Sequence, residues 1–122
     1  MALVRPARLV PGAVVAAVAA RDPERAAAFA RKHEIERVHA SYDDLLADPS
    51  VDAVYNPLPN ALHAEWTLKA LDAGKHVLCE KPFTSNEVEA RQVADASKKS
   101  GLVVMEAYHY RYHPLAERMR TV

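Results

Sequence analysis

Short apolar runs alternate with longer, partly polar segments along the chain, and this pattern predicts an α/β fold. The apolar runs cover residues 13–20, 38–39, 51–55, 76–79 and 102–105, and we interpret each of them as a strand. The first run, AVVAAVAA, contains only alanine and valine and is typical of a fully buried strand.

The segments between these runs carry the start and stop signals of helices. Side chains that cap a helix N-terminus precede them, namely Asp22, Ser41, Asn60 and either Thr84 or Ser85. The last three helices are expected to end at Pro49, Gly74 and Gly101. Because strands and helices alternate four times, we predict an α/β architecture with a parallel sheet.

Composition narrows the possible functions. The 122 residues contain 16 basic and 16 acidic side chains, so no net charge attracts nucleic acid or an anionic membrane. One cysteine excludes an internal disulfide and a zinc site built from several cysteines. The N-terminus imitates a signal peptide, but Pro11-Gly12 interrupts its apolar run. We expect a cytoplasmic protein and keep a secreted α/β domain as an alternative.

Proline-rich or charged segments follow the predicted strands, at residues 20–22, 56–60, 80–82 and 106–108. In open parallel sheets, ligands bind beyond the carboxyl ends of the strands. Polar loops are also common without a function. The clustering of these unusual segments at one sheet edge nevertheless predicts a ligand site there.

The stretch YNPLPNALHAEWTLKALDAGKHVLCEKPFTSN, residues 55–86, resembles the Gfo/Idh/MocA group of NAD(P)-dependent oxidoreductases. The shared features are a proline-rich strand end, a histidine three residues after Asn60, a helix that closes in Ala-Gly-Lys-His-Val, and Glu-Lys-Pro. The likeness continues into GLVVMEAYHYRYHP at residues 101–114, which is similar to the last Rossmann strand and the crossover to a second domain.

The resemblance implies that Lys81 is the catalytic residue, beside the nicotinamide and the substrate hydroxyl. A lysine there can donate a hydrogen bond to an oxyanion or relay its proton. The resemblance also implies that Glu80 orients Lys81 or holds a ribose hydroxyl, and that Pro82 makes the turn rigid. The alternative is a surface ion pair, which contributes little to stability.

Other site residues also follow from the resemblance. Pro57, Pro59, Asn60 and His63 match positions that line the nicotinamide side of the cofactor, and Arg111 matches an arginine that approaches it. A surface histidine at a helix N-terminus is the alternative for His63, and a solvated charge is the alternative for Arg111.

The end of the first predicted strand indicates the cofactor. NAD enzymes usually carry an acidic residue here that binds the ribose 2′-hydroxyl, but this chain has Ala20 followed by Arg21. A guanidinium can pair with the 2′-phosphate of NADP. We therefore expect NADP rather than NAD, unless Asp22 reaches the ribose instead of capping the helix.

A metal site is the competing interpretation of the C-terminal histidines. His109 and His113 are four residues apart and Glu106 lies three residues before the first, so a helix would place them on one face. Pro114 and the surrounding aromatic residues disfavour a regular helix, and no further ligand is evident. We expect no metal.

Two parts of the family pattern are missing from the chain. Its three glycines do not form the G-x-G-x-x-G loop, and residues 1–12 resemble the helix that follows this loop. We therefore predict an incomplete doubly wound, Rossmann-like sheet that lacks its first, central strand and the C-terminal substrate domain. Residues 1–122 would form a partial dinucleotide-binding domain, with 106–122 as the crossover, and the isolated chain would be unstable or bind NADP weakly.

The resulting hypothesis is an NADP-dependent oxidoreductase that acts on a sugar, polyol or related secondary alcohol. Its partner would be a small-molecule substrate, with no nucleic acid and no membrane, and the full-length protein would form a homo-oligomer. The alternative is a non-catalytic Rossmann-like remnant that binds a nucleotide or a partner protein.

Overall fold

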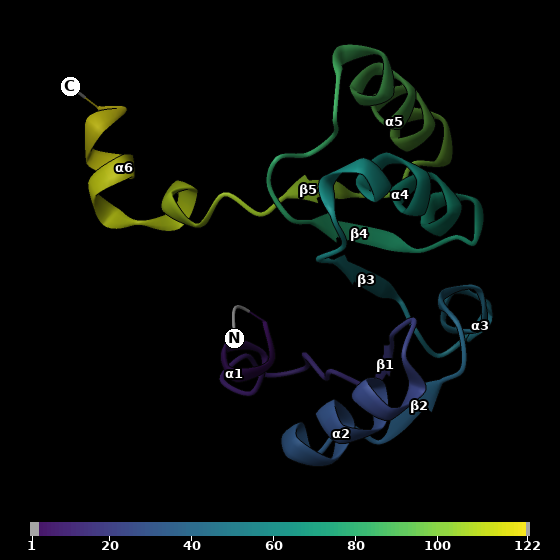
Figure 1. Ribbon diagram of the computed structural model, residues 1–122. Coiled ribbons are helices and arrows are strands. Elements are labelled where there is room, and N and C mark those ends of the chain that lie inside the picture. Colours follow the sequence, from purple (N-terminus) through teal and green to yellow (C-terminus); the bar gives the residue numbers. More distant parts are fainter. Residues whose placement is uncertain (1–2, 122) are drawn as a thin grey trace. The chain divides into compact units, whose positions relative to one another are not determined.

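The computed structural model describes residues 3–121 and confirms the α/β class (Figure 1). All strand pairs are parallel, and the strands form a two-stranded sheet and a three-stranded sheet. The chain divides into two compact units, Met1–Asp52 and Ala53–Val122, and each unit contains one of the sheets.

The first unit is built around strands β1 (Ala17–Ala19) and β2 (Arg37–His39), which pair with Val18 opposite Val38. Helix α2 (Pro23–His33) connects the two strands and packs against both. Helix α3 (Tyr42–Ala47) follows β2, and the single turn α1 (Val4–Ala7) precedes β1. Ser41 caps α3 as predicted, because its side chain accepts from the N–H of Asp44.

The prediction of a fully buried strand at residues 13–20 is wrong. The strand is only three residues long, its residues are half-buried, and the side chain of Val14 is 82% exposed. The physical reason is that, among the described residues, β1 hydrogen-bonds to β2 alone, so its other edge has no neighbouring strand.

The second unit contains strands β3 (Ala53–Asn56), β4 (His76–Cys79) and β5 (Val104–Glu106) in that spatial order. Helices α4 (His63–Asp72) and α5 (Glu87–Ser100) pack side by side, and α4 also packs against β3 and β4. Figure 1 shows both helices on the same side of this sheet. The side chains of Val77 and Cys79 on β4 and of Val93 on α5 are buried and belong to the core of this unit.

Several predicted boundaries in the second unit are corrected. Strands β3 and β5 each begin two residues later than predicted and end one residue later. Asn60 does not cap the following helix, because it opens the 3-10 turn η1 (Asn60–Leu62) and α4 begins only at His63. The cap of α5 is Asn86, whose side chain accepts from the N–H of Glu89, and not Thr84 or Ser85.

Among the described residues, the strands of the two sheets do not hydrogen-bond to one another. Within residues 3–121, β3 pairs with β4 only, just as β1 pairs with β2 only. These are the two strands that the missing strand was predicted to separate. The chain therefore has two short parallel sheets where we predicted one incomplete sheet.

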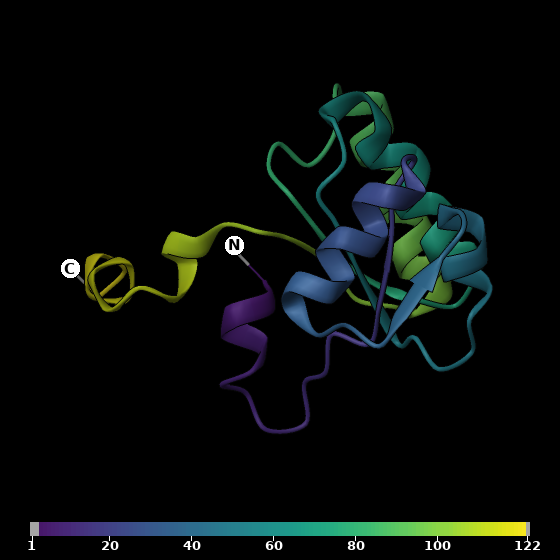
Figure 2. The same ribbon diagram turned by 60° about the horizontal axis from the view of Figure 1, so that its bottom comes forward.

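The segment after β5 contains the 3-10 helix η2 (His109–Tyr112) and helix α6 (Pro114–Met119). Figures 1 and 2 show this segment leading away from the three-stranded sheet. Its apolar side chains are largely exposed, with Tyr110 at 66%, Tyr112 at 69% and Met119 at 72%. Among residues 3–121, no helix has the length and apolar character that a membrane crossing requires.

Candidate active site

The carboxyl ends of the three strands in the second unit lie in register. Asn56 is opposite Cys79, and Cys79 is opposite Glu106. Backbone bonds continue past the strand ends, from the N–H of Glu80 to the Asn56 carbonyl (3.0 Å) and from the N–H of Ala107 to the Cys79 carbonyl (2.8 Å). The proline-rich, charged and acidic segments that the sequence placed at one edge are therefore neighbours in the structure.

The carboxylate of Glu80 is held by two donors. The Tyr55 hydroxyl on β3 donates to Oε1 at 2.5 Å, and the backbone N–H of Lys81 donates to Oε2 at 3.2 Å. The bond from Tyr55 is the main cause that lowers the pKa of Glu80. Burial, together with the Glu80 carboxylate, raises the pKa of Tyr55 to about 12. Glu80 therefore stays ionised and oriented at neutral pH.

The side chain of Lys81 is exposed and follows directly after Glu80. In the described part of the chain, its ammonium makes no hydrogen bond or ion pair, because the Glu80 carboxylate is engaged by Tyr55 and by the Lys81 backbone. The structure thus does not contain the surface ion pair that was the alternative for this segment. The peptide bond from Lys81 to Pro82 is cis.

His63 is 1% exposed, so the alternative of a surface histidine is wrong. It is the first residue of α4, and its ring lies between two loops. Nδ1 lies 2.7 Å from the Pro82 carbonyl oxygen, and Nε2 lies 2.6 Å from the Leu58 carbonyl oxygen. The ring therefore connects the loop after β3 with the turn after β4.

Asn56 forms the base of the same arrangement and is 3% exposed. Its amide nitrogen donates to the His63 carbonyl at 3.2 Å and to the Thr67 hydroxyl at 3.4 Å. Its side-chain oxygen accepts from the N–H of Leu58 at 3.3 Å. One buried side chain thereby joins the end of β3 to the start of α4 and to the loop between them.

A third strand end joins the site through Glu106. Its Oε1 accepts from the backbone N–H of Phe83 at 2.8 Å, directly after the Lys81–Pro82 peptide.

The Cys79 side chain is fully buried at the end of β4. Burial is the main cause that raises the pKa of its thiol to about 11. A thiol in this state is not a nucleophile at neutral pH.

The structure brings together most, but not all, of the predicted site residues. Glu80, Lys81, Pro82 and His63 lie within one network, and Pro57 and Pro59 flank the Leu58 carbonyl that His63 contacts. The Asn60 carbonyl accepts from the Ser85 hydroxyl at 3.4 Å. Arg111 lies on η2, where its side chain is exposed and, within residues 3–121, has no hydrogen-bond or ion-pair partner.

Arg21 belongs to the first unit, where it follows β1 and is exposed. The neighbouring Asp22 caps α2, because its Oδ1 accepts from the N–H groups of Glu24 (2.9 Å) and Arg25 (3.2 Å). Of the two possible roles for Asp22, the structure shows the capping role.

Sequence reasoning did not select Tyr55, Asn56 or Glu106 as site residues. Each lies at the end of a strand, and that position was the available signal. The missing information was the pairing register, which sets Tyr55 opposite Leu78 and Asn56 opposite Cys79 and so brings Tyr55 to Glu80.

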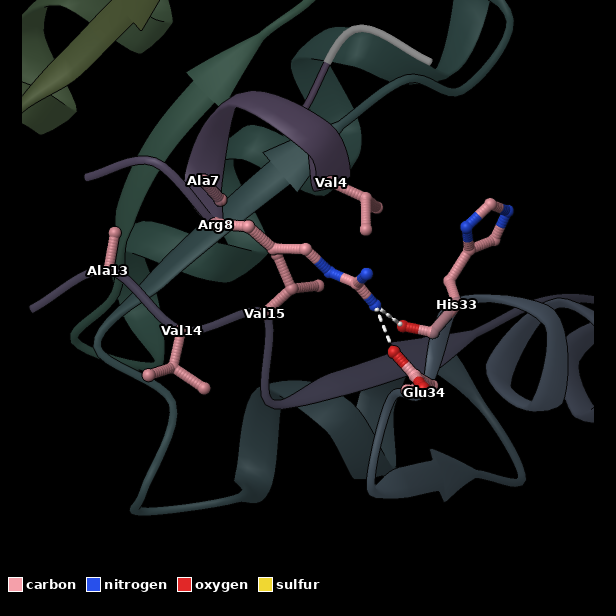
Figure 3. A pocket seen from close by; sticks show the side chains of 8 residues that line it. All are labelled: Val4, Ala7, Arg8, Ala13, Val14, Val15, His33 and Glu34. Atoms are coloured by element: carbon pink, nitrogen blue, oxygen red, sulfur yellow. Dashed lines mark hydrogen bonds and ion pairs between the residues drawn. The ribbon is translucent and has the colours of Figure 1, made fainter. Parts of the chain in front are cut away.

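The first unit also contains an open cavity of about 230 Å³. Figure 3 shows Arg8 reaching across it, where the guanidinium donates to the His33 carbonyl and pairs with Glu34 at 2.8 Å. The remaining lining is mostly apolar and comes from Val4, Ala7, Ala13, Val14 and Val15. None of the predicted site residues lines this cavity.

Comparison with known proteins assigns the chain to a family. A profile described as "Oxidoreductase family, NAD-binding Rossmann fold", the Gfo/Idh/MocA family, matches residues 3–108. The chain belongs to this family. The match includes every strand of both sheets and the whole network around His63 and Glu80.

This chain is similar in sequence to named enzymes of the Gfo/Idh/MocA family. The chain is 52% identical over 103 residues to D-xylose 1-dehydrogenase (NADP(+)) 2 of Haloferax volcanii, covering 84% of this chain and 32% of that protein. It is 44% identical over 108 residues to trans-1,2-dihydrobenzene-1,2-diol dehydrogenase of Sus scrofa, covering 88% and 32%. The chain therefore spans about a third of the length of these relatives.

A solved structure of the family has the same fold. KijD10, a 3-ketoreductase from Actinomadura kijaniata solved in complex with NADP, matches with a TM-score of 0.88 and 38% identity. The match covers 97% of this chain and 37% of that chain. The fold of this chain is therefore also found in a solved oxidoreductase structure that contains NADP.

Proposed function

We propose that this chain is the nucleotide-binding part of an NADP-dependent oxidoreductase that acts on a sugar, a polyol or a related secondary alcohol. In this proposal Lys81 is the catalytic residue and acts at the substrate oxygen. The site residues Arg21, Pro57, Pro59, Asn60, His63, Glu80, Pro82 and Arg111 serve the cofactor or hold Lys81 in place.

The observation that carries this proposal is the position of the Lys81 ammonium. It is exposed at the aligned carboxyl ends of three parallel strands, which is where ligands bind in open α/β sheets. Glu80 is held by Tyr55 and does not neutralise the ammonium by direct pairing. A positive group at this edge with no partner of its own is available to a ligand.

In this proposal Lys81 acts by electrostatic stabilisation and by acid–base catalysis. During carbonyl reduction its N–H groups would donate to the oxygen that gains negative charge, and the ammonium would pass a proton to that oxygen. In the oxidative direction the amine would receive the proton from the alcohol. NADP, when bound, supplies or accepts the hydride.

Residues in each of the two units suit a part of NADP. Arg21 is exposed beyond β1 and suits a 2′-phosphate, while the Asp22 carboxylate is used by the helix cap and is not directed at a ribose. The exposed loop with Pro57, Pro59 and Asn60 lies beside the Lys81 turn and suits the nicotinamide end. The sequence has no G-x-G-x-x-G segment for the pyrophosphate.

Names of the relatives support the cofactor and the substrate class. One is a D-xylose 1-dehydrogenase named for NADP(+), and another is a 3-ketoreductase solved with NADP. A further relative at 44% identity, from Saccharopolyspora spinosa, is a reductase of a deoxyglucose derivative. Two of the names describe a dehydrogenase or reductase of a sugar or a sugar derivative, and the third describes a ketoreductase.

The proposal is tested by replacing Lys81 with methionine in the complete polypeptide that carries these residues. Loss of one positioned acid–base group predicts that kcat falls by about 100-fold or more, with the Kd for NADPH nearly unchanged. The matched control is Lys98→Met, an exposed lysine in the last turn of α5, for which we expect normal turnover. Undiminished turnover of Lys81→Met would contradict the proposed role.

The alternative function is a non-catalytic remnant that binds a nucleotide or a partner protein. The observation in its favour is that β1 and β3 each have one unpaired edge within residues 3–121. Under the enzyme proposal, the 122-residue chain by itself should be poorly stable or bind NADPH only weakly. A tight, stoichiometric NADPH titration of the 122 residues without turnover would favour the remnant.

A further inference from the structure

The His63 ring occupies a position in which both of its nitrogens face hydrogen-bond acceptors. Nδ1 lies 2.7 Å from the carbonyl oxygen of Pro82, and Nε2 lies 2.6 Å from that of Leu58. Both separations are short for N–H···O bonds and are typical of charge-assisted ones. With 1% of its surface exposed, the residue has little access to water as a substitute partner.

Backbone carbonyls accept hydrogen bonds and do not donate them. A neutral imidazole carries a proton on one nitrogen only, so it can donate to one of these two carbonyl oxygens. The lone pair of its second nitrogen would then face the lone pairs of the other carbonyl oxygen. Both contacts are favourable only when each ring nitrogen carries a proton. The two contacts therefore suit a ring that donates from both nitrogens.

The surroundings of His63 supply an acceptor for each ring nitrogen, and these two contacts offset part of the cost of burying the ring. Position 63 is the first residue of α4, where the helix dipole opposes a cation, but this effect is smaller than either charge-assisted bond. Glu80, Cys79 and Glu106 are titratable groups of the same network, and Lys81 is exposed directly after Glu80.

We propose that His63 is a positioning residue that ties the loop after β3 to the turn after β4 through two donated hydrogen bonds. The Pro82 carbonyl belongs to the residue directly after Lys81, so the tie fixes the backbone from which the Lys81 side chain extends. His63 thus acts on the site through Lys81 and not as a ligand of the cofactor. The effect on catalysis rests on the proposed function. The two hydrogen bonds donated by the His63 ring do not depend on that function.

The first test measures the protons directly on the complete polypeptide. With ¹⁵N-labelled histidine at pH 7, the ring nitrogens are observed and His63 is assigned through its contacts to Leu58 and Pro82. We expect two slowly exchanging ring N–H signals for His63. One protonated and one bare nitrogen on this ring would overturn the proposal. This readout is independent of any enzymatic activity.

The second test uses the complete polypeptide and compares His63→Gln with the control His33→Gln in the first unit. Glutamine can reach one of the two carbonyls but not both, so the turn that carries Lys81 loses one attachment. We expect kcat to fall by about 100-fold while the Kd for NADPH changes less than about 3-fold, because displacement of a reacting group costs rate more than binding.

The two tests separate the possible failures. A loss of NADPH affinity as large as the loss of kcat would identify His63 as a direct cofactor ligand and overturn the positioning role. If the unchanged polypeptide shows no oxidoreductase activity, the proposed function fails, and the nitrogen signals still decide whether the tie exists. If His63→Gln does not fold, the signals of the unchanged chain decide the question in the same way.

Discussion

The hydroxyl of Tyr55 on β3 donates a 2.5 Å hydrogen bond to the Glu80 carboxylate at the end of β4. The two residues are 25 positions apart in the chain, and the parallel pairing of β3 with β4 brings them together. This bond orients the acidic residue that directly precedes Lys81. The bond is the main cause that lowers the pKa of Glu80, whereas the pKa of Tyr55 is raised first by burial and then by this bond.

Replacing Tyr55 with phenylalanine removes the donor and keeps the ring. We expect the pKa of Glu80 to rise, because the hydrogen bond favours its ionised form. At pH 7 the free energy of unfolding should fall by about 1 kcal/mol, and the difference should shrink as acid protonates the carboxyl in both proteins. The Glu80 carboxyl signal followed by NMR against pH gives the first quantity, and urea unfolding gives the second.

The control for this change is Tyr110→Phe, which removes the hydroxyl of a tyrosine that is 66% exposed. It should leave both quantities unchanged. An unchanged Glu80 titration in Tyr55→Phe would show that the bond does not form in solution.

Replacing Asn56 with alanine should destabilise the second unit by about 2 kcal/mol. The side chain is buried and joins Leu58, His63 and Thr67. Its removal takes this partner from one donor, the Leu58 N–H, and from two acceptors, the His63 carbonyl and the Thr67 hydroxyl. Urea unfolding measures the effect. Asn60→Ala is the matched control, because Asn60 is exposed and we expect a change below about 0.5 kcal/mol. Equal effects of the two substitutions would contradict the buried network.

Replacing Arg21 with alanine in the complete polypeptide should weaken NADPH binding by about 10-fold and leave NADH binding nearly unchanged. The reason is that only NADPH carries the 2′-phosphate that the guanidinium is proposed to pair with. Calorimetric titration with each cofactor measures both constants. Arg25→Ala, an exposed arginine on α2, serves as the control. An equal loss for both cofactors would reject Arg21 as the selective residue.

Asp48 makes the stability of the first unit depend on acid. Its carboxylate accepts from the hydroxyl and the N–H of Ser50 and pairs with Arg37 and His39, and the Ser50 hydroxyl bond is the largest cause that lowers its pKa to about 2. A lowered folded-state pKa stabilises the fold above the ordinary value of 3.8, and this stabilisation is lost as the pH falls toward 2.

Asp48→Asn should therefore unfold at lower urea concentration than the unchanged chain at pH 7, and the gap should close between about pH 4 and pH 2. Asp95→Asn, an exposed residue of α5, should show no such closing gap. A difference that stays constant with pH would show that the Asp48 contacts do not depend on its charge.

Local sequence signals predicted much of the fold. The cap at Asp22 followed by Pro23, the cap at Ser41 and the stop at Gly101 each act within one helical turn, and the structure shows all three. Strand β4 was predicted with its observed bounds, because an apolar run between Gly74 and Glu80 leaves little choice. The cap of α5 was missed because Thr84, Ser85 and Asn86 are all good caps, and only the backbone path decides among them.

The sequence by itself determined the α/β class and the sheet edge at which the proline-rich and charged segments gather, because short-range patterns and the order of strands and helices carry this information. Only the tertiary structure decided that His63 is buried between two carbonyls, that Tyr55 holds Glu80, and that Asn56 links a strand to a helix. Each of these contacts joins residues from different elements, and the register of parallel strands sets which residues meet. Pairing register depends on packing across the whole sheet, so no local pattern in the chain encodes it.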